Sequence, residues 1–183
     1  MSDIFVTRRA FIRRIAALGA SVPLVVTGQS ARSAPADARE LALEHLHTRE
    51  RIAIVYATGQ DYLRSALASL NRFLRDHYTG ELTNIDSALF DQLYELRRVL
   101  GVHAPFQVIS GYRSPATNAV LQQRGGGVAQ DSLHMQGRAV DVRLPGVALI
   151  DLRDAAKSLR AGGVGFYPRS NFVHLDTGRI RSW

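Results

Sequence analysis

Residues 132–141 read Ser-Leu-His-Met-Gln-Gly-Arg-Ala-Val-Asp, and residues 172–176 read Phe-Val-His-Leu-Asp. From residue 138 to 144 and from 172 to 176, apolar residues alternate with polar ones, which is typical of a half-buried β-strand. Successive side chains of a strand point to opposite faces of its sheet. If the two strands are neighbours and their valines face the core, Asp141 and His174 therefore point into the same cleft.

Gly137 supplies a turn that lets His134, in the preceding loop, fold back over this face. Two imidazoles and one carboxylate then converge and leave a fourth position open, which is the ligand set of a catalytic zinc site. A structural zinc site would need four protein ligands, usually cysteines, and the chain has none. The spacing alone leaves an alternative open, in which His134 and His174 are ordinary hydrogen-bonded histidines and Asp141 is an isolated surface charge.

The rest of the chain alternates between helical and strand patterns. The expected elements are a hairpin within residues 41–56, helices over 61–74, 86–101, 114–123 and 147–159, and strands over 106–109, 138–144, 164–166 and 172–176. Helices come early, and short strands with one helix between them follow. This order predicts an α+β fold.

Composition narrows the class of protein. With 183 residues, 46% of them hydrophobic, the chain is long enough to build a core and too apolar to be disordered. The formal net charge is +7, and nearly all of the basic residues are arginines. Five of these arginines precede residue 37, so the remainder is only weakly basic. That balance suits an anionic polymer such as cell wall, and without a basic stripe it argues against a nucleic-acid partner.

Residues 1–36 have the three parts of an export signal. Paired arginines at 8 and 9 precede a phenylalanine, an apolar run of about a dozen residues follows, and small residues end the segment. The paired arginines resemble the twin-arginine signal, which exports folded proteins. The apolar run falls short of the roughly 20 residues of a membrane-spanning helix. We therefore expect a signal peptide over 1–36, a partnership with the twin-arginine export machinery, no stable membrane span, and a periplasmic domain over 37–183.

Several motifs together resemble a known family. The spacing Ser-x-His-x-x-Gly-x-Ala-x-Asp at residues 132–141 is the first metal motif of the LAS-type zinc peptidases, whose second motif is a late strand carrying a ligand histidine. Residues 109–118 resemble the Ser-Gly-Tyr-Arg-Ser segment of the D-Ala-D-Ala branch. With residues 162–168 and 176–179, the chain resembles the YcbK-type murein endopeptidases over about residues 40–183. The implied fold is a small antiparallel sheet with helices packed on one face.

This resemblance implies one Zn²⁺ ion held by His134, Asp141 and His174. It also suggests Arg113 as an anchor for a free carboxylate of a peptidoglycan stem peptide, because a guanidinium binds carboxylates in a bidentate manner. A structural pairing of Arg113 with a nearby acid is the alternative. Ser132 either orients a ligand or touches substrate, or it only caps its own loop.

The general base is where the chain departs from better-known members. Several of those have a glutamate three residues before the final ligand histidine or a histidine two before it, positions held here by Asn171 and Phe172. Asp176, on the same strand face as His174, is either the base or a carboxylate that orients a ligand histidine. The catalytic candidates are therefore Asp176 and Arg113.

The remaining singled-out residues are aromatic or histidine side chains. Tyr112 and Tyr167 are candidates for the substrate groove. His45 and His47 mimic a ligand pair, but no acidic residue is fixed beside them. These two, and the histidines at 77 and 103 near helix ends, are interpreted as structural.

The expected function is that of an exported zinc metallopeptidase, a hydrolase that cuts peptide cross-links in peptidoglycan during cell-wall turnover. Two alternatives stay open at this point. One is a carboxypeptidase that removes D-Ala from stem peptides, and the other is a non-catalytic peptidoglycan-binding module that retains the metal site.

Overall fold

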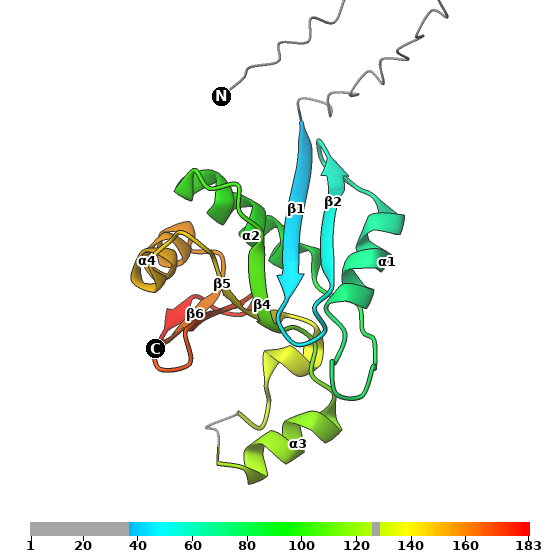
Figure 1. The fold of residues 1–183 in the computed structure, drawn as a ribbon, viewed down its shortest axis with the longest axis vertical. Coiled ribbons are helices and arrows are strands. Elements are labelled where there is room, and N and C mark those ends of the chain that lie inside the picture. Colours follow the sequence, from blue (N-terminus) through cyan, green and yellow to red (C-terminus); the bar gives the residue numbers. More distant parts are fainter. Residues whose placement is uncertain (1–36, 126–128) are drawn as a thin grey trace, which may run out of the picture. The chain divides into compact units, whose positions relative to one another are not determined.

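The computed structural model describes residues 37–125 and 129–183. The predicted signal peptide over 1–36 lies outside these residues. The strands are β1 (Ala38–His45), β2 (Arg51–Thr58), β3 (Asp61–Tyr62), β4 (Phe106–Ser110), β5 (Ala139–Arg143), β6 (Gly163–Tyr167), β7 (Phe172–Asp176) and β8 (Arg181–Ser182). The helices are α1 (Arg64–Phe73), α2 (Ser87–Leu100), α3 (Pro115–Gln123) and α4 (Leu149–Leu159), with a short 3₁₀ helix η1 over Leu133–Gln136. The predicted α+β fold is confirmed (Figure 1).

The strands form one sheet in the order β3-β2-β1-β4-β5-β7-β6-β8. The expected sheet was small and antiparallel, whereas the observed sheet has eight strands, and β1 runs parallel to β4 and β6 parallel to β8. A long connection through α1 and α2 separates β1 from β4, and such crossovers are what allow parallel pairing. The sheet therefore joins the early hairpin to the late strands that carry the metal motif.

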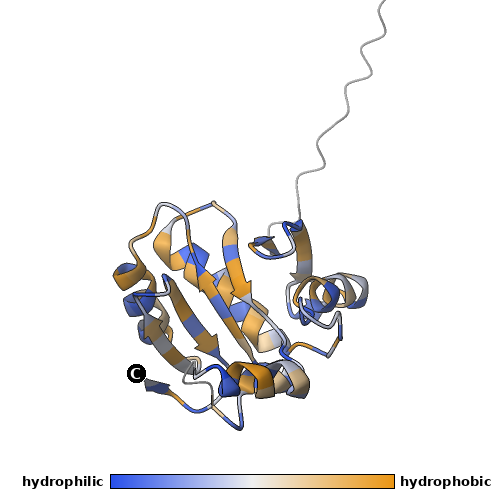
Figure 2. Ribbon diagram, turned by 60° about the horizontal axis from the view of Figure 1, so that its bottom comes forward, coloured by the Kyte–Doolittle hydropathy of each residue, from blue (hydrophilic) through white to orange (hydrophobic). Residues whose placement is uncertain are grey.

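The two motif strands are direct neighbours. Strands β5 and β7 pair antiparallel, and Asp141 lies opposite His174 in their register. The flanking Val140, Val142 and Val173 are fully buried in the core, so both polar side chains point to the other face, as the alternation predicts. Alternating hydrophobic and hydrophilic colours run along these strands (Figure 2).

Three helices complete the core. Buried side chains of α1, α2 and α4 join those of the strands in a single hydrophobic cluster, and α2 and α4 pack against each other. Helix α2 begins at the predicted cap, where the Asp86 carboxylate accepts the N–H of Ala88 at 3.1 Å, and ends at Gly101 with φ of 63°. The site motifs lie on the opposite, polar face of the late strands.

The helix expected over 61–74 starts later than predicted. Asp61 and Tyr62 instead pair with β2, because Gly59, at φ of 57°, reverses the chain into a tight hairpin. The segment 181–182 was not predicted as a strand, yet it pairs parallel with β6. No helix in the described part of the chain is long and apolar enough to cross a membrane.

Candidate metal centre

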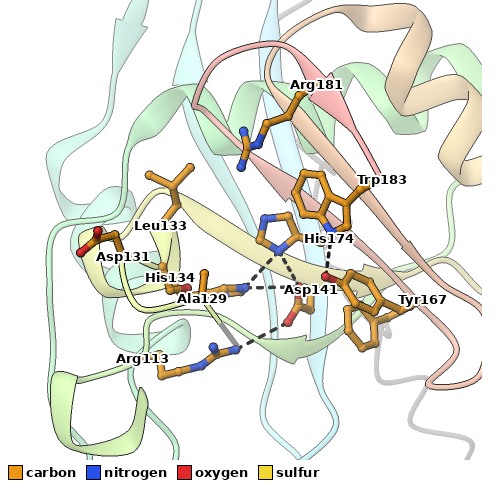
Figure 3. A pocket seen from close by; sticks show the side chains of 12 residues that line it. Arg113, Ala129, Asp131, Leu133, His134, Asp141, Tyr167, His174, Arg181 and Trp183 are labelled. Atoms are coloured by element: carbon orange, nitrogen blue, oxygen red, sulfur yellow. Dashed lines mark hydrogen bonds and ion pairs between the residues drawn. The ribbon is translucent and has the colours of Figure 1, made fainter. Parts of the chain in front are cut away.

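His134, Asp141 and His174 come together on the polar face of β5 and β7 (Figure 3). The Nδ1 atom of His174 lies 2.9 Å from Oδ1 of Asp141 and 3.2 Å from Nε2 of His134. Nε2 of His134 lies 3.3 Å from the same Asp141 oxygen. All three residues are at least nine-tenths buried. The cluster predicted from the sequence motif is therefore present in the structure, where His134 and His174, 40 positions apart in the chain, are in contact.

The outer nitrogen of each ring is fixed by a separate acceptor. Nδ1 of His134 lies 2.7 Å from the carbonyl oxygen of Gly111, which can only accept, so this nitrogen carries the proton. Nε2 of His174 donates in the same way to Oδ2 of Asp176 at 3.2 Å. The remaining nitrogens, Nε2 of His134 and Nδ1 of His174, are thereby left with lone pairs in the neutral rings.

Two nitrogen lone pairs and a carboxylate oxygen thus face one another within hydrogen-bond distance, with no donor between them. Such an arrangement repels itself unless a cation or a proton occupies the centre. Within residues 37–125 and 129–183, this is the one group of three such residues whose ligand atoms lie close enough to hold a metal ion. The donor set of two imidazoles and one carboxylate fits zinc with an open coordination position.

The ionisation of the cluster follows from these contacts. Burial by itself would raise the pKa of Asp141, but the rings of His134 and His174 outweigh it and hold that pKa well below its usual range. Burial opposes a charge on His174, but hydrogen bonds to Asp141 and Asp176 outweigh this effect and raise its pKa to about 8. The carboxylates therefore attract positive charge to the centre.

Asp176 lies on the far side of the His174 ring from Asp141. Its carboxylate is fully buried and does not line the cavity beside the cluster. It accepts the backbone N–H groups of Gly163 at 3.0 Å and Gly178 at 2.8 Å. Arg181 holds both of its oxygens, at 3.1 and 2.7 Å. With its lone pairs engaged in this way, Asp176 is placed to orient His174 rather than to take a proton from a substrate.

An open cavity of about 360 Å³ lies beside the cluster. It is lined by Arg113, Ala129, Asp131, Ser132, Leu133, His134, Asp141, Tyr167, Phe172, His174, Arg181 and Trp183. The three clustered residues, two arginine side chains and several aromatic rings thus share a single hollow. This arrangement has the concave shape and the mixed lining of a small substrate site.

Arg113 borders the cluster from the β4 side. Its Nη2 atom lies 3.9 Å from Oδ2 of Asp141, and Nη1 donates to Oδ1 of Asn118 at 3.3 Å. The Nε atom is buried and has no hydrogen-bond partner. Burial lowers the pKa of Arg113 from its usual value, although Asp141 and Asp76 partly compensate. A buried guanidinium with unused donors beside a cavity is suited to bind an anion.

Ser132 and Tyr112, the other predicted substrate-binding residues, lie in different surroundings. Ser132 lines the cavity, and its hydroxyl does not cap η1. Tyr112 does not line the cavity, whereas its neighbour Arg113 does. The Tyr112 ring packs against the hydrophobic core instead.

Six of the cavity residues received no role from the sequence pattern, among them Phe172, Arg181 and Trp183. Arg181 and Trp183 reach the site through β8, a strand too short to leave a periodic signal. Phe172 was considered only as a missing base, although its place on the face of His174 was apparent from the alternation. Tyr167, which sequence analysis placed in the groove, does line the cavity.

Comparison with known proteins gives concordant matches. Residues 33–183 match the family model Peptidase_M15_2, described as peptidoglycan L,D-endopeptidase MepK. A peptidoglycan L,D-endopeptidase MepK of Escherichia coli (strain K12) is 51% identical over 145 residues, which cover 79% of this chain and 80% of that protein. A probable peptidoglycan L,D-endopeptidase MepK of Haemophilus influenzae is 40% identical over 146 residues, covering 79% of this chain and 78% of that one.

Proposed function

The chain belongs to the Peptidase_M15_2 family of peptidoglycan L,D-endopeptidases, and on this premise we propose that it is an exported, zinc-dependent peptidase that hydrolyses peptide cross-links in peptidoglycan. The observation that carries the proposal is the cluster of His134, Asp141 and His174, whose lone pairs converge at the edge of a cavity. A family of peptidases with this donor set is expected to use a metal ion.

Each of the three residues would contribute one ligand atom to the ion. His134 and His174 offer Nε2 and Nδ1, and Asp141 offers a carboxylate oxygen that reduces the net charge of the centre. A zinc ion in such a site supplies Lewis acidity toward a peptide carbonyl and lowers the pKa of water to about 7. Asp176 keeps the His174 ring in the tautomer that leaves Nδ1 free for binding.

Arg113 is the residue that we assign to substrate. Its unused donors lie beside Asp141, so a carboxylate or a polarised carbonyl oxygen of a stem peptide can bind the guanidinium while the adjacent peptide bond lies over the cluster. Ser132, which also lines the cavity, can donate a second hydrogen bond to the substrate backbone. These contacts position the scissile bond without themselves reacting.

The test is to incubate the purified domain over 37–183 with defined cross-linked muropeptides, with and without a chelator, and to analyse the products by mass spectrometry. We expect dimers to be converted to monomers, and the chelator to stop the reaction until Zn²⁺ is added back. Loss of a single D-Ala would instead identify a carboxypeptidase. Binding without any product would identify a non-catalytic module.

Export is the second part of the proposal. It is supported by the paired arginines at 8 and 9 and by the small residues near 31–36. Replacing both arginines by lysine should block export while leaving the folded domain active in extracts. The measurement is the ratio of precursor to processed protein in cell fractions. Unchanged processing in the double variant would remove the twin-arginine assignment.

A further inference from the structure

One side of the cavity is built from three aromatic side chains, Tyr167, Phe172 and Trp183, here called the aromatic wall. The rings of Tyr167 and Phe172 stack with their centroids 4.6 Å apart. The indole N–H of Trp183 donates to the hydroxyl of Tyr167 at 2.8 Å. These contacts join the three rings into one surface, and Figure 3 shows the Trp183 indole next to the Tyr167 side chain.

The wall is held in place by the backbone as well. Trp183 continues the β8 pairing, because its N–H donates to the carbonyl of Val164 at 3.2 Å and its carbonyl accepts the N–H of Phe166 at 3.0 Å. A Cβ atom at Gly165 would lie 2.8 Å from ring atoms of both Trp183 and Tyr167. The two rings therefore lie directly over Gly165, in space that only a glycine leaves open.

This position puts the wall next to the metal ligands. Gly165 is the register partner of His174, and the ring centroids of Trp183 and His174 are 5.3 Å apart. Arg113 follows β4, whereas the wall lies on β6, β7 and the end of β8, so the two border the cluster from opposite sides. A peptide lying across the cluster would touch Arg113 on one side of the scissile bond and the wall on the other.

The wall presents aromatic ring surface to the cavity, and the Arg181 guanidinium lies over the Trp183 ring, 4.8 Å from its centroid. The indole N–H of Trp183 is already bonded to the Tyr167 hydroxyl, so Trp183 has no donor left to offer a ligand. Even so, Trp183 is 50% exposed and Tyr167 is 36% exposed. Large, rigid and partly exposed aromatic rings beside a reaction centre are suited to cover an aliphatic group. A saccharide is a poor candidate, because the glycan is attached several residues away from a cross-link, at roughly 3.3 Å per extended residue.

We propose that the aromatic wall is a specificity subsite that binds the aliphatic side chain of the stem-peptide residue flanking the scissile bond on the side away from Arg113. This proposal rests on the proposed function. It makes Trp183 and Tyr167 substrate-binding residues, with Phe172 stacked against the Tyr167 ring. The aromatic wall thereby selects substrates that carry a long side chain at this position. This selection does not depend on the binding of a carboxylate by Arg113.

The first test uses the fact that Trp183 is the one tryptophan of the chain. Metal-free wild-type domain, which cannot turn over, is titrated with a purified cross-linked muropeptide while intrinsic fluorescence is recorded, and calorimetry measures binding in parallel. We expect a saturable change in tryptophan emission with the same midpoint as the calorimetric curve. Calorimetric binding with unchanged emission would show that the ligand bypasses the wall.

The second test compares two synthetic cross-linked peptides that differ at one flanking residue, which carries either a straight four-carbon side chain or only hydrogen. We expect the wild-type enzyme to prefer the longer side chain by about ten-fold or more in kcat/KM. Trp183→Ala should reduce this preference to about three-fold or less, mainly through KM, with zinc content unchanged. Trp183→Phe should restore most of the preference.

Tyr78→Ala is the matched control, because Tyr78 is also an exposed aromatic residue (61%) and does not line this cavity. It should keep the wild-type preference. The subsite proposal would be wrong if Trp183→Ala kept the wild-type preference, or if its activity fell in proportion to a loss of bound zinc. Either result would leave the peptidase assignment intact. Failure of the wild-type domain to bind or cut any muropeptide would instead remove the proposed function, and the subsite with it.

Discussion

The described part of the chain contains two clusters of histidine side chains, and one of them, unlike the other, is arranged so that it could bind a metal ion. The first contains His134 and His174, with ring centroids 5.0 Å apart. The second contains His45, His47 and His77, in which the rings of His47 and His77 are stacked at 4.3 Å. Proximity of imidazoles is therefore common to both, and it does not by itself make a metal site.

The clusters differ in what their lone pairs face. In the second cluster, Nδ1 of His45 accepts the backbone N–H groups of His47 at 3.2 Å and Thr48 at 3.4 Å, so its lone pair is already used. The other ring nitrogen, Nε2, then carries the proton and is buried without a partner. In the first cluster, the outer nitrogens donate outward and the lone pairs point inward.

The clusters also differ in the carboxylates beside them. Both acidic neighbours of the second cluster are engaged elsewhere. Glu50 forms a bidentate pair with Arg75 at 2.8 and 2.9 Å, and Asp76 accepts backbone N–H groups, including that of Ser114 at 2.8 Å. Burial and the neighbouring histidines consequently lower the pKa of His45 to about 4, whereas Asp141 and Asp176 raise that of His174 to about 8.

The difference between the two clusters is tested most directly by removing one histidine from each. His134→Ala or His174→Ala should abolish zinc binding and lower kcat/KM by about 10³-fold or more, because each removes a ligand. His47→Ala, in the exposed part of the second cluster, should keep both zinc and activity. Metal analysis, muropeptide cleavage and circular dichroism are measured on all three proteins. Full activity in either ligand variant would contradict the zinc assignment.

A second prediction concerns the groups behind His174. Asp176→Asn should weaken zinc binding by about 10–100-fold, because the amide no longer holds the ring as firmly. Arg181→Met should have an effect in the same direction but smaller, because it acts through Asp176. Zinc affinity is measured by competition with a fluorescent chelator. An Asp176→Asn protein that binds zinc normally but does not turn over would instead identify Asp176 as the general base.

A third prediction follows from the raised pKa of His174. Below about pH 8, a proton occupies Nδ1 of the metal-free ring and competes with zinc for the same lone pair. Zinc affinity should therefore fall about ten-fold for each pH unit between 8 and 6. The competition assay is repeated at several pH values, with His47→Ala as a control that should give the same slope. A flat profile would exclude this proton competition.

A last prediction concerns how the stability of the folded domain depends on pH through His45. Its folded-state pKa lies below its unfolded value, so the unfolded chain takes up a proton first as the pH falls. Stability is thus retained above about pH 6.5 and lost toward pH 4, by about 1 kcal/mol between pH 7 and 5.5. Urea unfolding of the metal-free wild-type domain and of His45→Asn at both pH values isolates this loss, because the opposite contribution of His174, whose pKa is raised, is present in both proteins. His45→Asn, which keeps an acceptor near the Nδ1 position, should flatten the dependence, and an equal loss in both proteins would assign it to other groups.

Much of the metal centre could be predicted from the sequence, because it depends on alternation within strands. The period-2 pattern put Asp141 and His174 on one face, and their pairing in register is confirmed. Gly137 was expected to turn the chain, and it does so with φ of 65°. A Cβ atom there would meet the carbonyl oxygen of Asn84 at 2.4 Å, which adds a steric reason for glycine.

Other parts of the site could not be predicted, because they depend on contacts between distant segments. The two residues of β8 are too few to show a period, so the wall residue Trp183 and the cavity residue Arg181 gave no signal. The same holds for the extent of the sheet, since no local pattern indicates that β1 would pair parallel with β4. Likewise, the engagement of Asp176 by Gly163 becomes evident only once β6 lies beside β7.

The loop that carries Arg113 is fastened to the loop that carries His134 at two points. The N–H of Arg113 donates to the carbonyl of His134 at 3.2 Å, and Nδ1 of His134 donates to the carbonyl of Gly111 at 2.7 Å. Arg113, the proposed substrate anchor, and His134, a proposed metal ligand, are thus held together by hydrogen bonds. A change of residue that shifts this loop would therefore displace Arg113 and His134 together.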